Sequence, residues 1–246
     1  MFPIGDDNHG ARGVPVVTVG LIVVNVLVYL YELTLSLPAL QNFIFTYGAI
    51  PAEIERGTDL YTLFTSMFVH GGFAHVAGNM LFLWIFGDNI EQRFGSVLYL
   101  VFYVGTGLAA SGAHILTDPG SLVPTVGASG AISGVMGAYL LLFPGAWVNC
   151  LWGVGTILRI PYAAIRKLFA SDEHKFWRWT VPLPAWLVLI WFVARSFLPS
   201  LETIRSDEEI QGINHLAHLA GFLASLTVFF FVRKDLLLRY VHGRSL

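Results

Sequence analysis

The chain has 246 residues, of which 55% are hydrophobic and only 12% are charged. A soluble domain usually carries about 25% charged residues, so this composition excludes an ordinary globular protein and indicates one that crosses a membrane several times. The net charge is -2, and no basic patch indicates a nucleic-acid partner. Cys150 is the only cysteine, which excludes an intrachain disulfide.

Six segments come close to the roughly 20 mainly apolar residues that a membrane-spanning helix needs. In chain order they cover residues 15–35, 63–89, 97–116, 127–143, 183–198 and 212–232. Acidic residues precede the first segment, and no small-residue cleavage site follows it, so we expect it to be retained rather than removed as a signal peptide. We therefore predict an all-α membrane protein with one domain over residues 1–246, built as a six-transmembrane-helix bundle.

The basic residues of the connections orient these predicted helices. If the N-terminus is cytoplasmic, Arg56, Arg195 and Arg205 are the only basic residues outside among the 14 Lys and Arg residues. The positive-inside rule therefore predicts that both termini are cytoplasmic. The connection 145–181 mixes cationic and aromatic residues, which predicts a cytoplasmic loop at the membrane surface, with a short amphipathic or re-entrant piece at residues 148–160.

Chemically capable polar residues lie inside the apolar segments, where they are costly and functional by default. Ser129 stands in the sequence Gly-Ala-Ser-Gly at the start of the predicted fourth helix, and His218 lies in the second turn of the sixth. In the predicted topology both helices start on the outer side. A serine hydroxyl is a poor nucleophile at neutral pH, so Ser129 needs a base, and His218 is the best-placed candidate. Taken alone, Gly-Ala-Ser-Gly is also typical of plain helix packing.

Small residues recur at helical spacing on the predicted fourth and sixth helices: Gly127, Gly130, Gly134, Gly221 and Ser225. The first two flank Ser129 and leave room for a substrate backbone to approach closely. The last two share one face of their helix with His218. Close packing of these faces would bring His218 next to Ser129.

His75 and Asn79 are four residues apart and therefore share one face of the predicted second helix. Both side chains can donate hydrogen bonds to a developing oxyanion, and the backbone N–H of Ser129 at a helix N-terminus would be a third donor. Taken alone, the pair is equally typical of a structural bond between helices. We expect His70 to brace the preceding loop rather than to act directly, and Glu32 in the first helix to make a packing contact.

No acidic residue is evidently placed to orient His218, which favours a Ser-His dyad over a triad. His215 lies three residues before His218 and would be the nearest partner for a shared metal ion. No HExxH motif or nearby acidic ligand accompanies the pair, so we expect no metal site and no cofactor.

Together these motifs resemble the rhomboid family of intramembrane serine proteases, in its bacterial type. The matching stretches are residues 68–80, 127–132 and 217–222, with further likeness at 87–95 and 183–186. The resemblance covers nearly the whole chain and implies the six-helix core. It also implies Ser129 as nucleophile, His218 as general base, and an oxyanion hole of His75, Asn79 and the Ser129 amide.

The resemblance implies partners as well: the lipid bilayer, and transmembrane protein substrates that the family cleaves near the outer face. Trp186, Trp191 and Phe192 are candidates for the lateral gate that the fifth helix forms in this family. An alternative is a proteolytically silent rhomboid-like protein that binds or escorts membrane clients. A small transporter is a third alternative, although the polar residues cluster at one depth. Short tails favour a prokaryotic plasma membrane.

One position departs from the family pattern. Some relatives carry an aromatic residue one helical turn after the serine, where it stacks on the catalytic histidine. This chain has Ser133 there. Asn214, another side chain or water would then have to hold His218.

Overall fold

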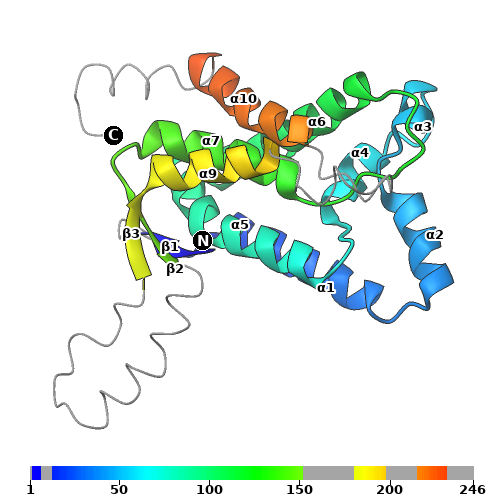
Figure 1. The fold of residues 1–246 in the computed structure, drawn as a ribbon, viewed down its shortest axis with the longest axis horizontal. Coiled ribbons are helices and arrows are strands. Elements are labelled where there is room, and N and C mark those ends of the chain that lie inside the picture. Colours follow the sequence, from blue (N-terminus) through cyan, green and yellow to red (C-terminus); the bar gives the residue numbers. More distant parts are fainter. Residues whose placement is uncertain (1, 7–12, 152–179, 198–214, 232–246) are drawn as a thin grey trace, which may run out of the picture.

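Helices make up most of the chain in the computed structural model, which describes residues 2–6, 13–151, 180–197 and 215–231 (Figure 1). The helices are α1 (Val16–Glu32), α2 (Leu37–Tyr47), α3 (Pro51–Glu55), α4 (Thr62–Thr65), the 3-10 helix η1 (Ser66–Phe68), α5 (Phe73–Phe94), α6 (Ser96–Thr117), α7 (Ser129–Leu142), α9 (Ala185–Phe197) and α10 (His215–Phe231). The strands are β1 (Phe2–Asp6), β2 (Trp147–Leu151) and β3 (Thr180–Pro184).

Helix α7 lies in the centre of the bundle, where it packs against α5, α6, α9 and α10. An unbroken run from Ala131 to Tyr139 is buried. A helix of 14 residues is only about 21 Å long, short of the roughly 30 Å hydrocarbon core of a bilayer. Since neighbouring helices cover α7, its length does not have to match the lipid.

The predicted second spanning segment, 63–89, is not one helix. The structure breaks it into α4 and η1 on one side and α5 on the other, bent by 93°. At the break the backbone N–H of His70 donates to Glu32 Oε1 instead of to a helical carbonyl, at 3.0 Å. The side chain of a distant helix thus satisfies a donor that a continuous helix would have paired internally.

Only some of the six predicted spans meet a length-and-hydropathy criterion within the described ranges. Helix α6 is long and apolar enough to cross a membrane, and the bent pair of α4–η1 and α5 would count as a second span if taken together. Helices α1 and α7 are apolar but shorter. The number of six spans and the cytoplasmic termini therefore stay predictions.

Apolar side chains form the core of the bundle and also cover much of its outer surface. Large apolar side chains are exposed along α1, α6, α9 and α10, including Val23, Leu27, Leu30, Val101, Leu108, Ile190 and Leu223. Polar side chains are buried between the helices, including Thr18, Asn25, Glu32, Asn79, Asn89, Glu91, Thr106 and Ser133. A protein folded in water rarely combines so much exposed apolar surface with buried polar groups, so this pattern is that of a helical membrane protein.

Glu91, in the last turn of α5, joins three helices. Its carboxylate accepts the backbone N–H groups of Val17 and Thr18 at 2.9 and 2.8 Å. It also accepts the hydroxyl groups of Thr18 and Ser96 at 2.9 and 2.7 Å. The donors at the N-terminus of α1 are thus capped by a negative charge from another helix, which suits the helix dipole.

A three-stranded antiparallel sheet at one end of the bundle corrects the purely helical prediction (Figure 1). Cys150 of β2 stands opposite Pro3 of β1 and Val181 of β3. Helix α9 begins at Ala185, directly after Pro184. Proline has no N–H for a hydrogen bond within a helix, so it is tolerated near a helix start but not in its interior. Part of the predicted surface loop is therefore strand, while residues 152–179 lie outside the described chain.

Asp6 anchors the N-terminal strand to the helices. Its Oδ2 accepts hydrogen bonds from Asn89 Nδ2 at 3.0 Å and from the Tyr139 hydroxyl at 2.6 Å. Cys150 of the neighbouring strand β2 is fully buried, and burial raises the pKa of its thiol to about 11. Because the thiolate is the reactive form, alkylation of Cys150 requires the sheet to open.

We predict that Asp6→Ala speeds alkylation of Cys150 by about tenfold or more. Hydrogen bonds to a charged group contribute about 1.5–3 kcal/mol, and about 1.4 kcal/mol corresponds to a tenfold population change. The rate is measured with iodoacetamide at pH 8 on folded protein in detergent. Asp118→Ala, at an exposed site, is the control; equal rates for both variants would show that Asp6 does not hold the sheet closed.

Candidate active site

Ser129 and His218, 89 positions apart in the sequence, are hydrogen-bonded in the structure. His218 Nε2 lies 2.7 Å from Ser129 Oγ. Ser129 is the first residue of α7, His218 lies in the first turn of α10, and both side chains are half-buried. With the imidazole proton on Nδ1, Nε2 accepts the hydrogen bond from the serine hydroxyl, which is the arrangement that a general base requires.

The pairing of these side chains depends on a very close approach of α10 to α7. A Cβ atom added at Gly221 would collide with the backbone carbonyl of Gly130. A Cβ atom at Gly130 would lie 2.6 Å from Cβ of Ala110 in α6. A side chain at Gly221 would therefore push α10 away from α7 and separate His218 from Ser129, whereas one at Gly130 would push α7 away from α6.

The small residues of α7 and α10 make one contact that differs from the sequence prediction. Gly130 does face Gly221, but Gly134 faces the side chain of Thr106 in α6. Ser225 of α10 instead packs against Gly137, one residue that the sequence analysis missed. Gly130 and Gly137 are seven residues, or about two turns, apart and share one face; this spacing is the signal that would have identified Gly137.

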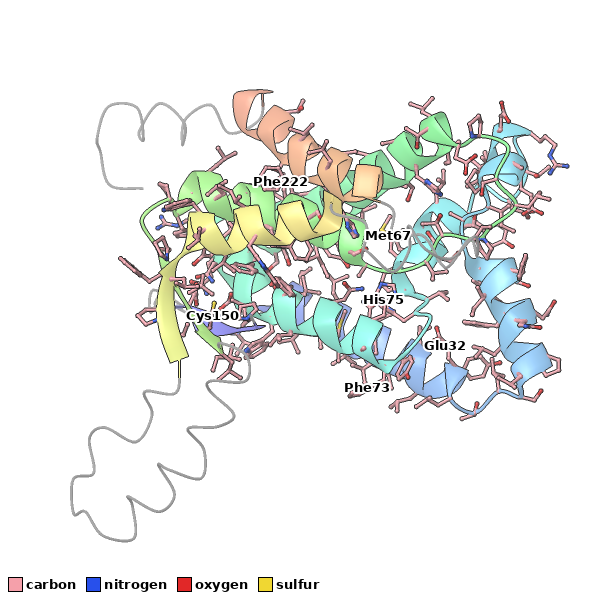
Figure 2. The ribbon with its side chains drawn as sticks, viewed as in Figure 1. Glu32, Met67, Phe73, His75, Cys150 and Phe222 are labelled. Carbon is pink, nitrogen blue, oxygen red and sulfur yellow. The ribbon has the colours of Figure 1, made fainter. Side chains whose placement is uncertain are left out.

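Gly127 places the loop before Ser129 against α5. Its φ of +117° lies in a region that L side chains rarely adopt. An added Cβ atom would lie 2.6 Å from the Cε1 and Nε2 atoms of His75 and 3.6 Å from Asn79 Nδ2. The two predicted oxyanion donors thus border the loop that carries Ser129, and Figure 2 shows His75 projecting from α5 in the middle of the bundle.

His70 is buried behind Asn79 and fixes the orientation of its amide. Asn79 Nδ2 lies 3.0 Å from His70 Nε2, and His70 Nδ1 lies 3.3 Å from the Phe68 carbonyl. With the proton on Nδ1, the ring donates to Phe68 and accepts one N–H of Asn79. The second N–H of that amide remains directed elsewhere. The Glu32 carboxylate accepts the backbone N–H of His70. Glu32 therefore helps to position the site, beyond the packing contact that the sequence predicted.

Several of the residues considered around His218 can be compared with the structure. Ser133 is buried, and its hydroxyl donates to the Ser129 carbonyl at 2.8 Å. Asn214, named as a possible support, lies outside the described residues. The ring of Phe192 in α9 lies 6.1 Å from the ring of His218 between centroids. Of the other predicted gate residues, Trp186 is exposed and Trp191 is half-buried.

These groups together suit an acyl transfer. A hydroxyl nucleophile is paired with an imidazole base, and amide and imidazole donors border the same loop, where they can face a developing oxyanion. In the described ranges, no three His, Cys, Asp or Glu side chains gather into a group that could hold a metal ion.

Comparison with known proteins gives the same family as the motifs. The family model described as Rhomboid domain matches residues 57–235, a stretch that includes Ser129, His218, His75 and Asn79. The chain is similar to RHOMBOID-like protein 5 of Arabidopsis thaliana, with 28% identity over 208 residues, which is 85% of this chain and 53% of that protein.

Two bacterial proteins are also similar. The identity to Putative rhomboid protease YdcA of Bacillus subtilis (strain 168) is 29% over 127 residues, covering 46% of this chain and 63% of that protein. The identity to Rhomboid protease AarA of Providencia stuartii is 26% over 155 residues, covering 57% and 55%. The matched region thus spans between half and two thirds of these curated relatives. The chain belongs to the rhomboid family of integral membrane proteins.

Proposed function

We propose that this protein is an intramembrane serine endopeptidase that cleaves transmembrane segments of other membrane proteins with a Ser129–His218 dyad. The observation that carries the proposal is the 2.7 Å contact between His218 Nε2 and Ser129 Oγ. Membership of the rhomboid family and the similarity to relatives named as proteases support it.

In the first step Ser129 Oγ attacks the carbonyl carbon of the scissile peptide bond. His218 Nε2 takes the hydroxyl proton as the new C–O bond forms. The carbonyl oxygen becomes an oxyanion, which His75, Asn79 and the backbone N–H of Ser129 stabilise by hydrogen bonds. The Ser129 N–H is suited to this because the first N–H groups of a helix have no partner within the helix.

In the second step the tetrahedral intermediate collapses. The C–N bond breaks, and His218 returns its proton to the leaving amine. A water molecule then attacks the acyl-enzyme, with His218 again taking a proton, and the carboxylic acid product leaves as Ser129 regains its hydrogen. The half-buried state of both dyad residues leaves a route for that water.

The fold supports the predicted orientation in the membrane. Strand β1 pairs with β2, so the N-terminus and the start of the basic loop share one end of the bundle. Helix α7 runs from Ser129 toward that sheet, which puts the dyad at the opposite end. We infer a six-span protein with cytoplasmic termini and a site near the outer face. Substrate would enter between α5 and α9, and the host membrane is proposed to be a prokaryotic plasma membrane.

We expect Ser129→Ala and His218→Ala each to lower cleavage of a transmembrane reporter in proteoliposomes by about a thousandfold or more, since dyad members act as a unit. Ser121→Ala, which removes a serine hydroxyl from the loop before α7, should cleave normally. Wild-type protein that binds reporters without cutting any would favour the client-binding alternative. Normal cleavage by Ser129→Ala would contradict the assignment.

His75→Ala and Asn79→Ala should each lower kcat by about 10²–10³, as for the loss of one oxyanion donor. The KM should change little, because the donors act mainly on the transition state. Steady-state kinetics on the same reporter measure both constants. If the variants lost only thermal stability while kcat of the folded protein was kept, the residues would have a structural role instead.

A further inference from the structure

We propose that Phe192 of α9 is a positioning residue that holds the His218 imidazole in its productive orientation, in place of the aromatic residue missing at position 133. The inference rests on the proposed function. The two rings lie 6.1 Å apart between centroids at an interplanar angle of 40°. Aromatic rings attract each other at centroid separations of about 4.5–7 Å, so the contact is within range.

Phe192 is itself held from the other side. Its ring lies 4.9 Å from the ring of Phe82 in α5, tilted by 47°. Both phenylalanines are half-buried. Phe192 therefore stands between two helices that carry the site, with Phe82 as the backing from α5 and His218 as the contact on α10.

The residue at position 133 cannot hold the His218 ring by stacking on it. Ser133 lies one helical turn after Ser129, but its hydroxyl donates to the Ser129 carbonyl at 2.8 Å. It is small and 1% exposed, so it presents no flat surface to an imidazole. The hydrogen bond to Ser129 fixes one edge of the His218 ring, whereas an apolar ring beside it limits tilting about that bond.

The contact makes the dyad depend on the placement of α9. Any movement of α9 away from α5 would separate Phe192 from Phe82 and withdraw it from His218. A protein that must open between α5 and α9 would therefore hold its base in the productive orientation only after α9 has returned. In that case, loosening α9 would not speed the chemical step.

The test separates chemistry from entry of a substrate helix. A small fluorophosphonate probe reaches Ser129 without having to pass as a helix between α5 and α9, so its labelling rate in detergent reports on the dyad. We expect Phe192→Leu to lower this rate and kcat for a transmembrane reporter by about two- to tenfold, the range that one aromatic contact explains. The KM should change by less than about twofold.

Two further variants control for packing. Phe192→Tyr keeps an aromatic ring and should retain the wild-type labelling rate. Ile190→Ala removes a large apolar side chain from an exposed position on the same helix and should change neither rate. If Phe192→Leu does not fold, Phe192→Met, whose unbranched side chain fills irregular gaps in a core, takes its place with the same expectation.

The outcomes distinguish this inference from the proposed function. Wild-type labelling that is lost in Ser129→Ala, together with an unchanged rate in Phe192→Leu, would overturn the role of Phe192 alone. A folded wild type that is not labelled at all would overturn the proposed function. A Phe192→Tyr variant that is labelled as slowly as Phe192→Leu would also contradict the inference, because the aromatic ring would then not be what matters.

Discussion

The close contact of α7 with α10 at Gly130 and Gly221 is the constraint on which the rest of the site depends. Lipid tails are as apolar as the helices, so helices in a membrane associate through close packing of small residues rather than through the hydrophobic effect. Here that packing brings the N-terminal ends of two helices together and sets the distance between His218 and Ser129. On the other side of the site, Gly127 allows the loop before Ser129 to lie close to His75 of α5.

Buried hydrogen bonds supply the second constraint. Several polar side chains are buried between the helices, where a group without a hydrogen bond is costly, and two buried glutamates pair with backbone groups of other segments. Glu91 fastens the ends of α1 and α6 to α5. At the other end of α1, Glu32 holds His70, which in turn holds the amide of Asn79. Buried hydrogen bonds thus keep the helices in place and also orient a proposed oxyanion donor.

The sequence predicted local features better than long-range ones. The bounds of α6 and α7 differ from the prediction by one or two residues, because apolar length and glycine spacing are local signals. The pairing of Ser129 with His218 followed from small residues at helical spacing. The sheet was not predicted, since strands β1 and β2 lie far apart in the chain and pair through the backbone. The contact of Phe192 with His218 depends on how α9 is rotated, which no local pattern specifies.

The measurement that tests the central claim most directly is the position of a covalent adduct. Wild-type protein and His218→Ala are treated with a fluorophosphonate probe, and the modified peptide is identified by mass spectrometry. An activated serine predicts one adduct on Ser129 in the wild type and almost none in His218→Ala, because an unassisted hydroxyl is a poor nucleophile. An adduct on another residue, or equal modification of Ser129 without His218, would contradict the account.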